Sequence, residues 1–171
     1  WGYGNFYSYV ARFDLANKYA RYYRTAKFNR LYYDPATRYV PWTNADKTLM
    51  SNATATAAWH NPYNTVEGSR NLTIDNTQTA NWVNDDGSYT SASVIFYPAT
   101  YFKWTGTGTL TGPTDANNIA TNFSKVEIKS ANAPFTKGTD RTDCAAATCT
   151  YTEEIQNFAN WYTYYRSRIL L

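Results

Sequence analysis

The clearest hydrophobic pattern in the chain lies in its last thirty residues. Thr150 and Glu153 have the spacing of a capping box, in which a hydroxyl and a carboxylate each satisfy a backbone N–H group at the start of a helix. Apolar residues then recur on one helical face at Ile155, Phe158, Ala159, Tyr162 and Ile169. The pattern predicts an amphipathic helix that lies against an apolar surface. No helix stop signal follows Ile169, so we expect the chain to be a piece of a longer polypeptide.

Other apolar patterns predict shorter elements. Residues 93–97 and 100–104 carry strand signals on either side of Pro98. Residues 125–129 alternate between apolar and polar, which predicts a strand with Val126 and Ile128 facing inward. Within residues 1–30, a helical stripe is formed by Phe6, Val10, Phe13, Ala20 and Tyr23.

The middle of the chain lacks such periodicity. Residues 43–93 are dominated by Asn, Thr, Ala, Ser and Asp, with turn signals at Asn61-Pro62 and Asp86-Gly87. We expect long loops here, held by Trp59, Tyr63 and Trp82. The predicted fold class is therefore α+β: an irregular, loop-rich and aromatic-rich chain with a few antiparallel strands and a C-terminal amphipathic helix.

The composition points to a surface protein outside the cell. Aromatic residues make up 18% of the 171 residues, with 17 Tyr and 6 Trp, whereas charged residues make up only 17%. Tyr has an apolar body and a polar tip, which suits partly wet surfaces and interfaces. No apolar run approaches the roughly 20 residues of a membrane-spanning helix.

The chain has two cysteines, Cys144 and Cys149, with four residues between them. In an oxidising compartment they could form a disulfide. A disulfide that closes so small a loop stabilises the folded state by about 2 kcal/mol. A zinc site is the alternative, but it needs four ligands. The sole histidine, His60, is far away in the sequence, so we favour a disulfide.

Positive charge is concentrated near the N-terminus, although the net charge of the chain is only +3. A candidate basic patch consists of Arg12, Arg21 and Arg24, which could contact a nucleic-acid backbone. The solvated face of a helix explains the same residues, and we prefer that interpretation.

No residue pattern predicts catalysis. Hydrolytic chemistry needs a nucleophile or metal held by a base, whereas His60 stands alone and Glu153 and Glu154 are explained by helix capping. The run Asp85-Asp86-Gly87 lacks the spacing of a calcium loop. We expect no enzyme, metal or cofactor. Exposed rings could stack on sugars, although core packing is the commoner use of such residues; the candidates are Tyr63, Trp82, Tyr89, Tyr101 and Trp104.

Several blocks resemble one family in their order along the chain. Residues 28–42, Phe-Asn-Arg-Leu-Tyr-Tyr-Asp-Pro-Ala-Thr-Arg-Tyr-Val-Pro-Trp, resemble a segment of the type IV pilus tip-associated adhesins, the PilC/PilY family. Further blocks resemble it at residues 44–47, 51–59, 99–101, 126–134 and 141–168, whereas residues 60–95 and 105–122 match weakly.

The resemblance implies a domain organisation. Residues 1–150 would be an insertion and recognition region, and residues 151–171 the start of the first helix of a von Willebrand factor A-like host domain. The family's Asp-x-Ser-x-Ser metal motif and its calcium-binding loop are both missing from this sequence, so no metal ligand is carried over.

The resemblance also implies a function. It predicts a non-enzymatic, extracellular module of a pilus tip adhesin that acts in attachment, pilus biogenesis and twitching motility. Expected partners are minor pilus subunits, other parts of the same adhesin, a host surface or glycan receptor, or neighbouring copies. Two alternatives stay open: a self-polymerising filament subunit completed by strands or helices from neighbouring copies, and a DNA-contacting module, which is less favoured because a solvated helix face explains the same basic residues.

Overall fold

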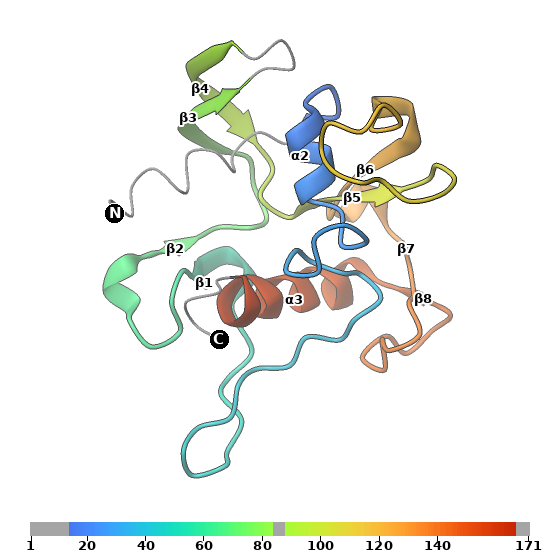
Figure 1. The fold of residues 1–171 in the computed structure, drawn as a ribbon. Coiled ribbons are helices and arrows are strands. Elements are labelled where there is room, and N and C mark those ends of the chain that lie inside the picture. The colour runs from blue at the N-terminus through green and yellow to red at the C-terminus, as the bar shows by residue number, and fades with distance from the viewer. Residues whose placement is uncertain (1–13, 84–87, 167–171) are drawn as a thin grey trace. The chain divides into compact units, whose positions relative to one another are not determined.

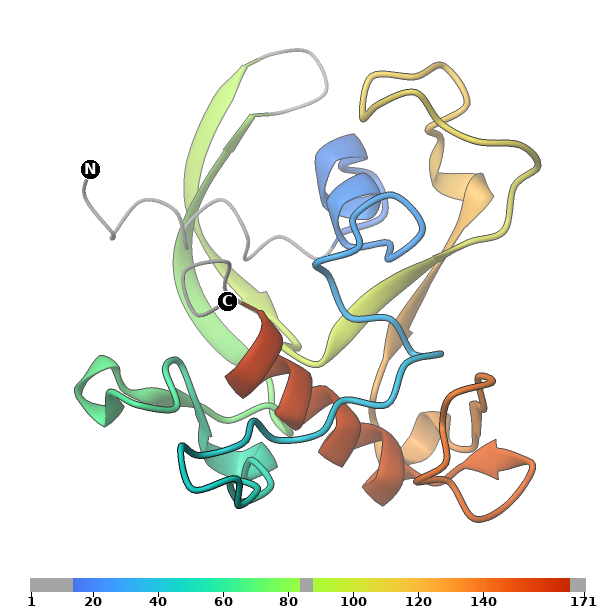
Figure 2. The same ribbon diagram turned by 60° about the horizontal axis from the view of Figure 1, so that its bottom comes forward.

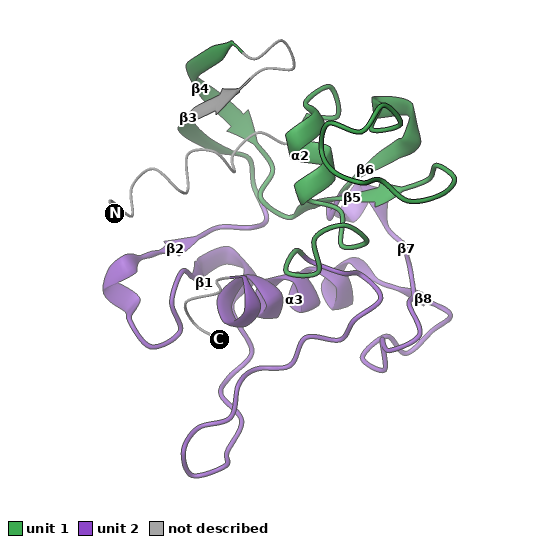
Figure 3. Cartoon of the chain, viewed as in Figure 1, with its two compact units in different colours: residues 1–32, 74–126 green, residues 33–73, 127–171 purple. Residues whose placement is uncertain are grey.

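The chain divides into two compact units, which we describe separately (Figure 3). The computed structural model describes residues 14–83 and 88–166, with the backbone alone for residues 80–83. Unit 1 comprises residues 1–32 and 74–126, and unit 2 comprises residues 33–73 and 127–171. Each unit is therefore built from two segments that are distant in the sequence.

In its described residues, unit 1 has a short helix, a 3₁₀ turn and two strand pairs (Figure 1). Its elements are α2 (Lys18–Tyr23), β3 (Asn76–Val83), β4 (Tyr89–Phe96), β5 (Thr100–Trp104), η4 (Ala120–Asn122) and β6 (Phe123–Glu127), the last ending one residue beyond the unit. β3 and β4 form a long curved ribbon in which Asn76 is opposite Phe96 and Val83 is opposite Tyr89 (Figure 2). β5 pairs with β6.

Aromatic side chains and the buried Arg21 hold unit 1 together. The core consists of Phe102, Leu110 and Phe123, with Leu15, Tyr22, Phe28 and Trp104 packed against it. Tyr22 and Phe28 are stacked at a centroid distance of 5.1 Å. Arg21 donates from Nε to Asn118 Oδ1 at 2.7 Å and from Nη1 to the carbonyl of Leu15 at 2.9 Å. A buried cation thus ties α2 to the irregular segment before β6.

Unit 2 is organised around the C-terminal helix. Its elements are η2 (Ala55–Ala57), β1 (Ala58–Trp59), η3 (Thr65–Glu67), β2 (Ser69–Arg70), η5 (Ser130–Asn132), β7 (Phe135–Thr136), β8 (Thr148–Cys149), α3 (Tyr151–Asn160) and the π-helical turn η6 (Trp161–Tyr165). β1 pairs with β2, and β7 pairs with β8. The strands are only two residues long, so side-chain contacts with the helix carry much of the architecture.

The predicted start of α3 is confirmed. Thr150 Oγ1 accepts the N–H of Glu153, and the Glu153 carboxylate accepts the N–H of Thr150 at 2.7 Å, which completes the capping box. The predicted apolar face is buried at Ile155, Phe158, Ala159 and Tyr162, whereas Ile169 lies outside the described residues. After Asn160 the helix continues as a π turn, in which Arg166 N donates to Trp161 O at 3.0 Å.

The polar face of α3 is buried as well, which the amphipathic pattern did not predict. Asn157 Oδ1 accepts the N–H of Tyr39 at 2.7 Å, and Asn160 Oδ1 accepts the N–H of Ala53 at 2.9 Å. Asn157 Nδ2 also donates to the carbonyl of Thr37 at 2.9 Å. Buried backbone groups in irregular segments need partners, and these amides supply them. The helix therefore binds segment 33–53 through polar side chains in addition to its apolar face.

The structure confirms the α+β class, with antiparallel strand pairs and a C-terminal helix, and corrects several elements. The predicted long loop over residues 43–93 is wrong at β3 and at the start of β4. The expected strand at 125–129 begins two residues earlier, at Phe123; Ile128 is buried but lies beyond the strand, and Val126 is only partly buried. The prediction that residues 151–171 begin a von Willebrand factor A-like domain stays a prediction.

The N-terminal helical stripe is only partly described. Phe6, Val10 and Phe13 lie outside the described residues. Ala20 is buried in α2, as expected, but Tyr23 is 50% exposed, so it does not belong to an inward-facing stripe. None of the helices in the described ranges has the length and apolar character to cross a membrane.

Candidate functional site

A disulfide fixes the segment that leads into α3. Cys144 and Cys149 are bonded, with an S–S distance of 2.01 Å, and both side chains are buried. Lys137 Nζ donates to the carbonyl of Cys144 at 2.6 Å, and Glu153 Oε1 accepts the N–H of Ala145 at 3.1 Å. The small loop is thus tied to β7 on one side and to the first turn of α3 on the other. This pairing confirms the disulfide that the cysteine spacing favoured.

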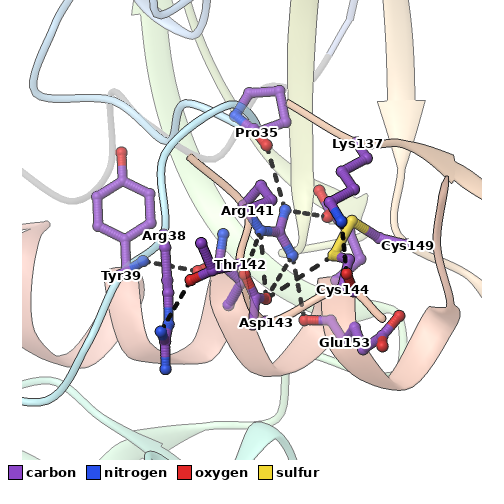
Figure 4. A network of polar contacts seen from close by, with 12 residues as sticks. Pro35, Arg38, Tyr39, Lys137, Arg141, Thr142, Asp143, Cys144, Cys149 and Glu153 are labelled. Carbon is purple, nitrogen blue, oxygen red and sulfur yellow. Dashed lines mark hydrogen bonds and ion pairs between the residues drawn. A yellow bond between two sulfur atoms is a disulfide. The ribbon is translucent and has the colours of Figure 1, made fainter. Parts of the chain in front are cut away.

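Arg141 is the centre of a polar network beneath this loop (Figure 4). Its side chain is fully buried, and Nη1 lies 2.5 Å from Oε2 of Glu154, which is also fully buried. Nη2 lies 2.9 Å from Oδ2 of Asp143, and Nη1 donates to the carbonyl of Pro35 at 3.2 Å. Tyr33 donates its hydroxyl to the other Glu154 oxygen at 2.9 Å. Three distant segments of unit 2 therefore meet at one guanidinium.

The electrostatics of this network favour the charged forms of Arg141 and Asp143. Burial acts to lower the pKa of Arg141, but hydrogen bonds with Asp143 and the negative charge of Glu154 outweigh it and raise the pKa above its usual value. Burial acts to raise the pKa of Asp143, whereas the hydrogen bond and charge of Arg141 lower it overall. The charged groups form ion pairs and hydrogen bonds with one another. This arrangement suits a structural role in positioning segment 33–39 on α3.

His60 joins the β1–β2 region to the end of the helix. Its Nδ1 lies 3.0 Å from the hydroxyl of Tyr162, and Arg166 Nη2 donates to the His60 carbonyl at 3.1 Å. Arg166 also lies over the Tyr162 ring, 4.2 Å from its centroid. Burial, followed by the charges of Arg166 and Arg70, lowers the pKa of His60 to about 4. The imidazole is therefore neutral at neutral pH and is explained by its contacts with the helix end.

A row of partly exposed rings lies on unit 2, and we call Tyr39, Trp42, Tyr63 and Tyr165 the aromatic strip. The ring centroids are 5.2 Å apart for Tyr39 and Tyr165, 6.4 Å for Trp42 and Tyr165, and 6.0 Å for Trp42 and Tyr63. Tyr63 is 66% exposed, and the other three rings are half-buried. The rings come from three separate segments, so the fold assembles this surface.

The sequence singled out only Tyr63 from this strip. Tyr39 and Trp42 belong to the block 28–42 that carries the family resemblance, and Tyr165 lies in the predicted C-terminal helix; none of the three was singled out for a surface role. A local signal exists, because Pro41 fixes an extended backbone between Tyr39 and Trp42. The contacts with Tyr63 and Tyr165 span more than twenty and more than a hundred residues, and no local pattern reports them.

The other predicted binding rings belong to unit 1 and have different environments. Tyr89 is 60% exposed in β4, whereas Tyr101 is only 1% exposed, so its ring offers no free face. Trp104 packs against Phe28 and Phe123 with centroid distances of 5.3 and 4.9 Å. Trp82 lies in β3, but its side chain is outside the described part of the structure.

The candidate basic patch does not form an exposed face in the described residues. Arg21 and Arg24 are 4% and 3% exposed, and Arg12 lies outside the described residues. Arg21 binds Asn118, and Arg24 lies beside Tyr32, where burial lowers its pKa. The expectation of a solvated helix face is therefore wrong for Arg21 and Arg24, since both side chains are buried inside unit 1.

Metal binding has no geometric support in residues 14–83 and 88–166. No group of three or more His, Cys, Asp or Glu side chains is placed there to hold an ion. Of the acidic run weighed as a cation site, Asp85, Asp86 and Gly87 all lie outside the described residues.

Comparison with known proteins gives one informative similarity. The chain is 29% identical to the type IV pilus biogenesis factor PilY1 of Pseudomonas aeruginosa (strain PAK), in a 158-residue alignment that covers 87% of the chain. The chain spans only 11% of the length of that curated relative. No protein-family model matches the chain, and no solved structure matches it.

Proposed function

We propose that the chain acts in type IV pilus biogenesis as part of a PilY1-like surface protein. The observation that carries this proposal is the similarity to PilY1, which extends over 87% of the chain. The similarity covers both units, because 158 aligned residues cannot be accommodated in either unit alone. Since the chain spans 11% of that relative, the pilus role of the whole protein is carried over as a proposal.

Within that role, the module acts outside the cell and has no catalytic function. The Cys144–Cys149 disulfide supports an oxidising compartment, because structural disulfides persist mainly in exported proteins. The side chains of Arg141, Asp143 and Glu154 form ion pairs with one another, so we assign this network a structural role and no catalytic acid, base or nucleophile. Its task is to hold irregular loops in a fixed arrangement, as expected of a module that displays a surface for attachment. Twitching motility would depend on it through pilus assembly.

Removing the module from the bacterium that encodes it tests this proposal. We expect an in-frame deletion of the 171 residues to reduce the amount of sheared surface pilin several-fold and to abolish twitching. A copy supplied in trans should restore both. Arg141→Met should resemble the deletion because it unpairs a buried carboxylate, and Arg38→Met should not, because that side chain is exposed. Normal piliation and twitching in the deletion strain would contradict the proposal.

A further inference from the structure

The aromatic strip of unit 2 is rigid, although most of it lies on irregular segments. Tyr165 donates its hydroxyl to the carbonyl of Val40 at 2.8 Å, and the hydroxyl of Tyr39 accepts the N–H of Asp34 at 3.0 Å. Burial raises the pKa of Tyr39 to about 12, so this phenol stays neutral. The hydrogen-bonded hydroxyls hold these two rings in place. Binding of a ligand therefore costs less conformational entropy at these side chains.

The loop that carries Tyr63 is preorganised as well. Asn61 Oδ1 accepts the N–H groups of Tyr63 at 2.9 Å and Asn64 at 3.2 Å. Asn61 Nδ2 donates to Oε1 of Glu67 at 3.1 Å, which closes the loop. On the other side of the contact, the carbonyl of Trp42 accepts the N–H of Met50 at 2.7 Å. An exposed aromatic side chain on a closed, hydrogen-bonded loop is an arrangement typical of recognition surfaces.

The chain around Trp42 and Tyr63 is polar and carries little charge, although exposed Arg38 precedes Tyr39 and half-buried Arg166 follows Tyr165. Between Tyr39 and Glu67 the charged residues are Asp46, Lys47 and Glu67. The segments 43–49 and 61–67, which adjoin Trp42 and contain Tyr63, otherwise carry six amide or hydroxyl side chains, such as Asn44, Thr48 and Asn64, and two exposed aliphatic ones, Leu49 and Val66. A polyanion such as a nucleic acid requires clustered cations, which are missing from this stretch. The charge balance fits an uncharged ligand that is rich in hydroxyl groups.

We infer that the aromatic strip binds a neutral glycan. The negative faces of Tyr63 and Trp42 are suited to the C–H face of a sugar ring, and the neighbouring amide and hydroxyl groups are suited to its hydroxyls. This binding site goes beyond the proposed pilus function and does not depend on it, because glycan binding is a property of the isolated chain. Exposed Val66, 92% accessible on the same loop, makes an apolar protein the competing occupant, and the experiment separates the two.

Affinity electrophoresis of the full 171-residue chain tests the inference. The gels contain one of three neutral polysaccharides, hydroxyethylcellulose, galactomannan or yeast mannan, or the anionic dextran sulfate as a comparison. We expect at least one neutral polysaccharide to retard the chain, with little change as the salt concentration rises. Tyr63→Ala should weaken the binding by about tenfold, the loss of one stacking contact worth about 1.4 kcal/mol.

Two exposed positions supply matched controls. Tyr89→Ala removes a ring of similar exposure from unit 1, and Val66→Ser removes the apolar side chain next to Tyr63 on the loop. Both variants should bind as the wild type does, and circular dichroism should show that all three variants are folded. The inference is overturned if no neutral polysaccharide retards the chain, if only dextran sulfate does, or if Tyr63→Ala binds normally. Equal losses in Val66→Ser and Tyr63→Ala would also overturn it and would assign the loop to a protein partner.

Discussion

Replacing Arg141 with methionine is expected to lower the free energy of unfolding by about 3–5 kcal/mol. The side chain is fully buried, and its loss leaves the buried Glu154 carboxylate without its cation 2.5 Å away. Asp143 and the carbonyl of Pro35 lose their guanidinium partner as well. Urea unfolding of the oxidised chain, followed by tryptophan fluorescence, measures the change.

The matched control for this substitution is Arg38→Met. Arg38 is exposed and donates to Thr142 Oγ1 at 2.9 Å, so the same chemical change should cost less than about 1 kcal/mol. The double variant Arg141→Met, Glu154→Met should recover a large part of the loss, because it removes the unpaired charge together with its partner. Equal stabilities for Arg141→Met and Arg38→Met would contradict a structural role for the buried ion pair.

Asn157→Leu is expected to destabilise the chain by about 2–4 kcal/mol, since each buried group left without its hydrogen bond costs about 1–3 kcal/mol. The substitution preserves volume approximately but deprives the N–H of Tyr39 and the carbonyl of Thr37 of their partners. Thr152→Leu, at an exposed position of α3, is the control and should change stability little. If the urea unfolding midpoint of Asn157→Leu equals that of the wild type, the position of segment 33–39 does not depend on this amide.

Local signals in the sequence were sufficient for the parts of the structure that are local. The capping box at Thr150 and the disulfide between Cys144 and Cys149 involve residues three and five positions apart, and both were predicted. β5 was predicted with its observed bounds, because four of its five residues are aromatic or β-branched and it follows Pro98 closely. These elements needed no information about the rest of the chain.

The β3–β4 ribbon shows where local reasoning failed. The expected turn at Asp86-Gly87 falls between the two strands, outside the described residues. The flanking residues, mainly Thr, Ser, Asn and Ala, carry no apolar alternation, so they predicted a loop. Their pairing over eight positions, from Asn76–Phe96 to Val83–Tyr89, depends on cross-strand contacts that periodicity does not report.

The polar parts of the cores were not predictable from residue type. Arg21 and Arg24 indicated a solvated surface because charged residues are rarely buried unless they are paired. The partners that make burial acceptable are distant: Asn118 for Arg21, and Tyr33, 121 positions away, for Glu154 in unit 2. The aromatic strip has the same origin, since its rings come from segments that are distant in the sequence and meet only in the folded chain.

The central claim is that polar side chains of α3 hold segment 33–53 in one conformation, and amide hydrogen exchange of the native 171-residue chain tests it most directly. The N–H groups of Tyr39 and Ala53 lie outside helices and strands, yet they donate to Asn157 and Asn160 at 2.7 and 2.9 Å. The account predicts that both amides exchange as slowly as amides inside α3. Exchange at the rate of an unstructured peptide at Tyr39 and Ala53 would contradict it.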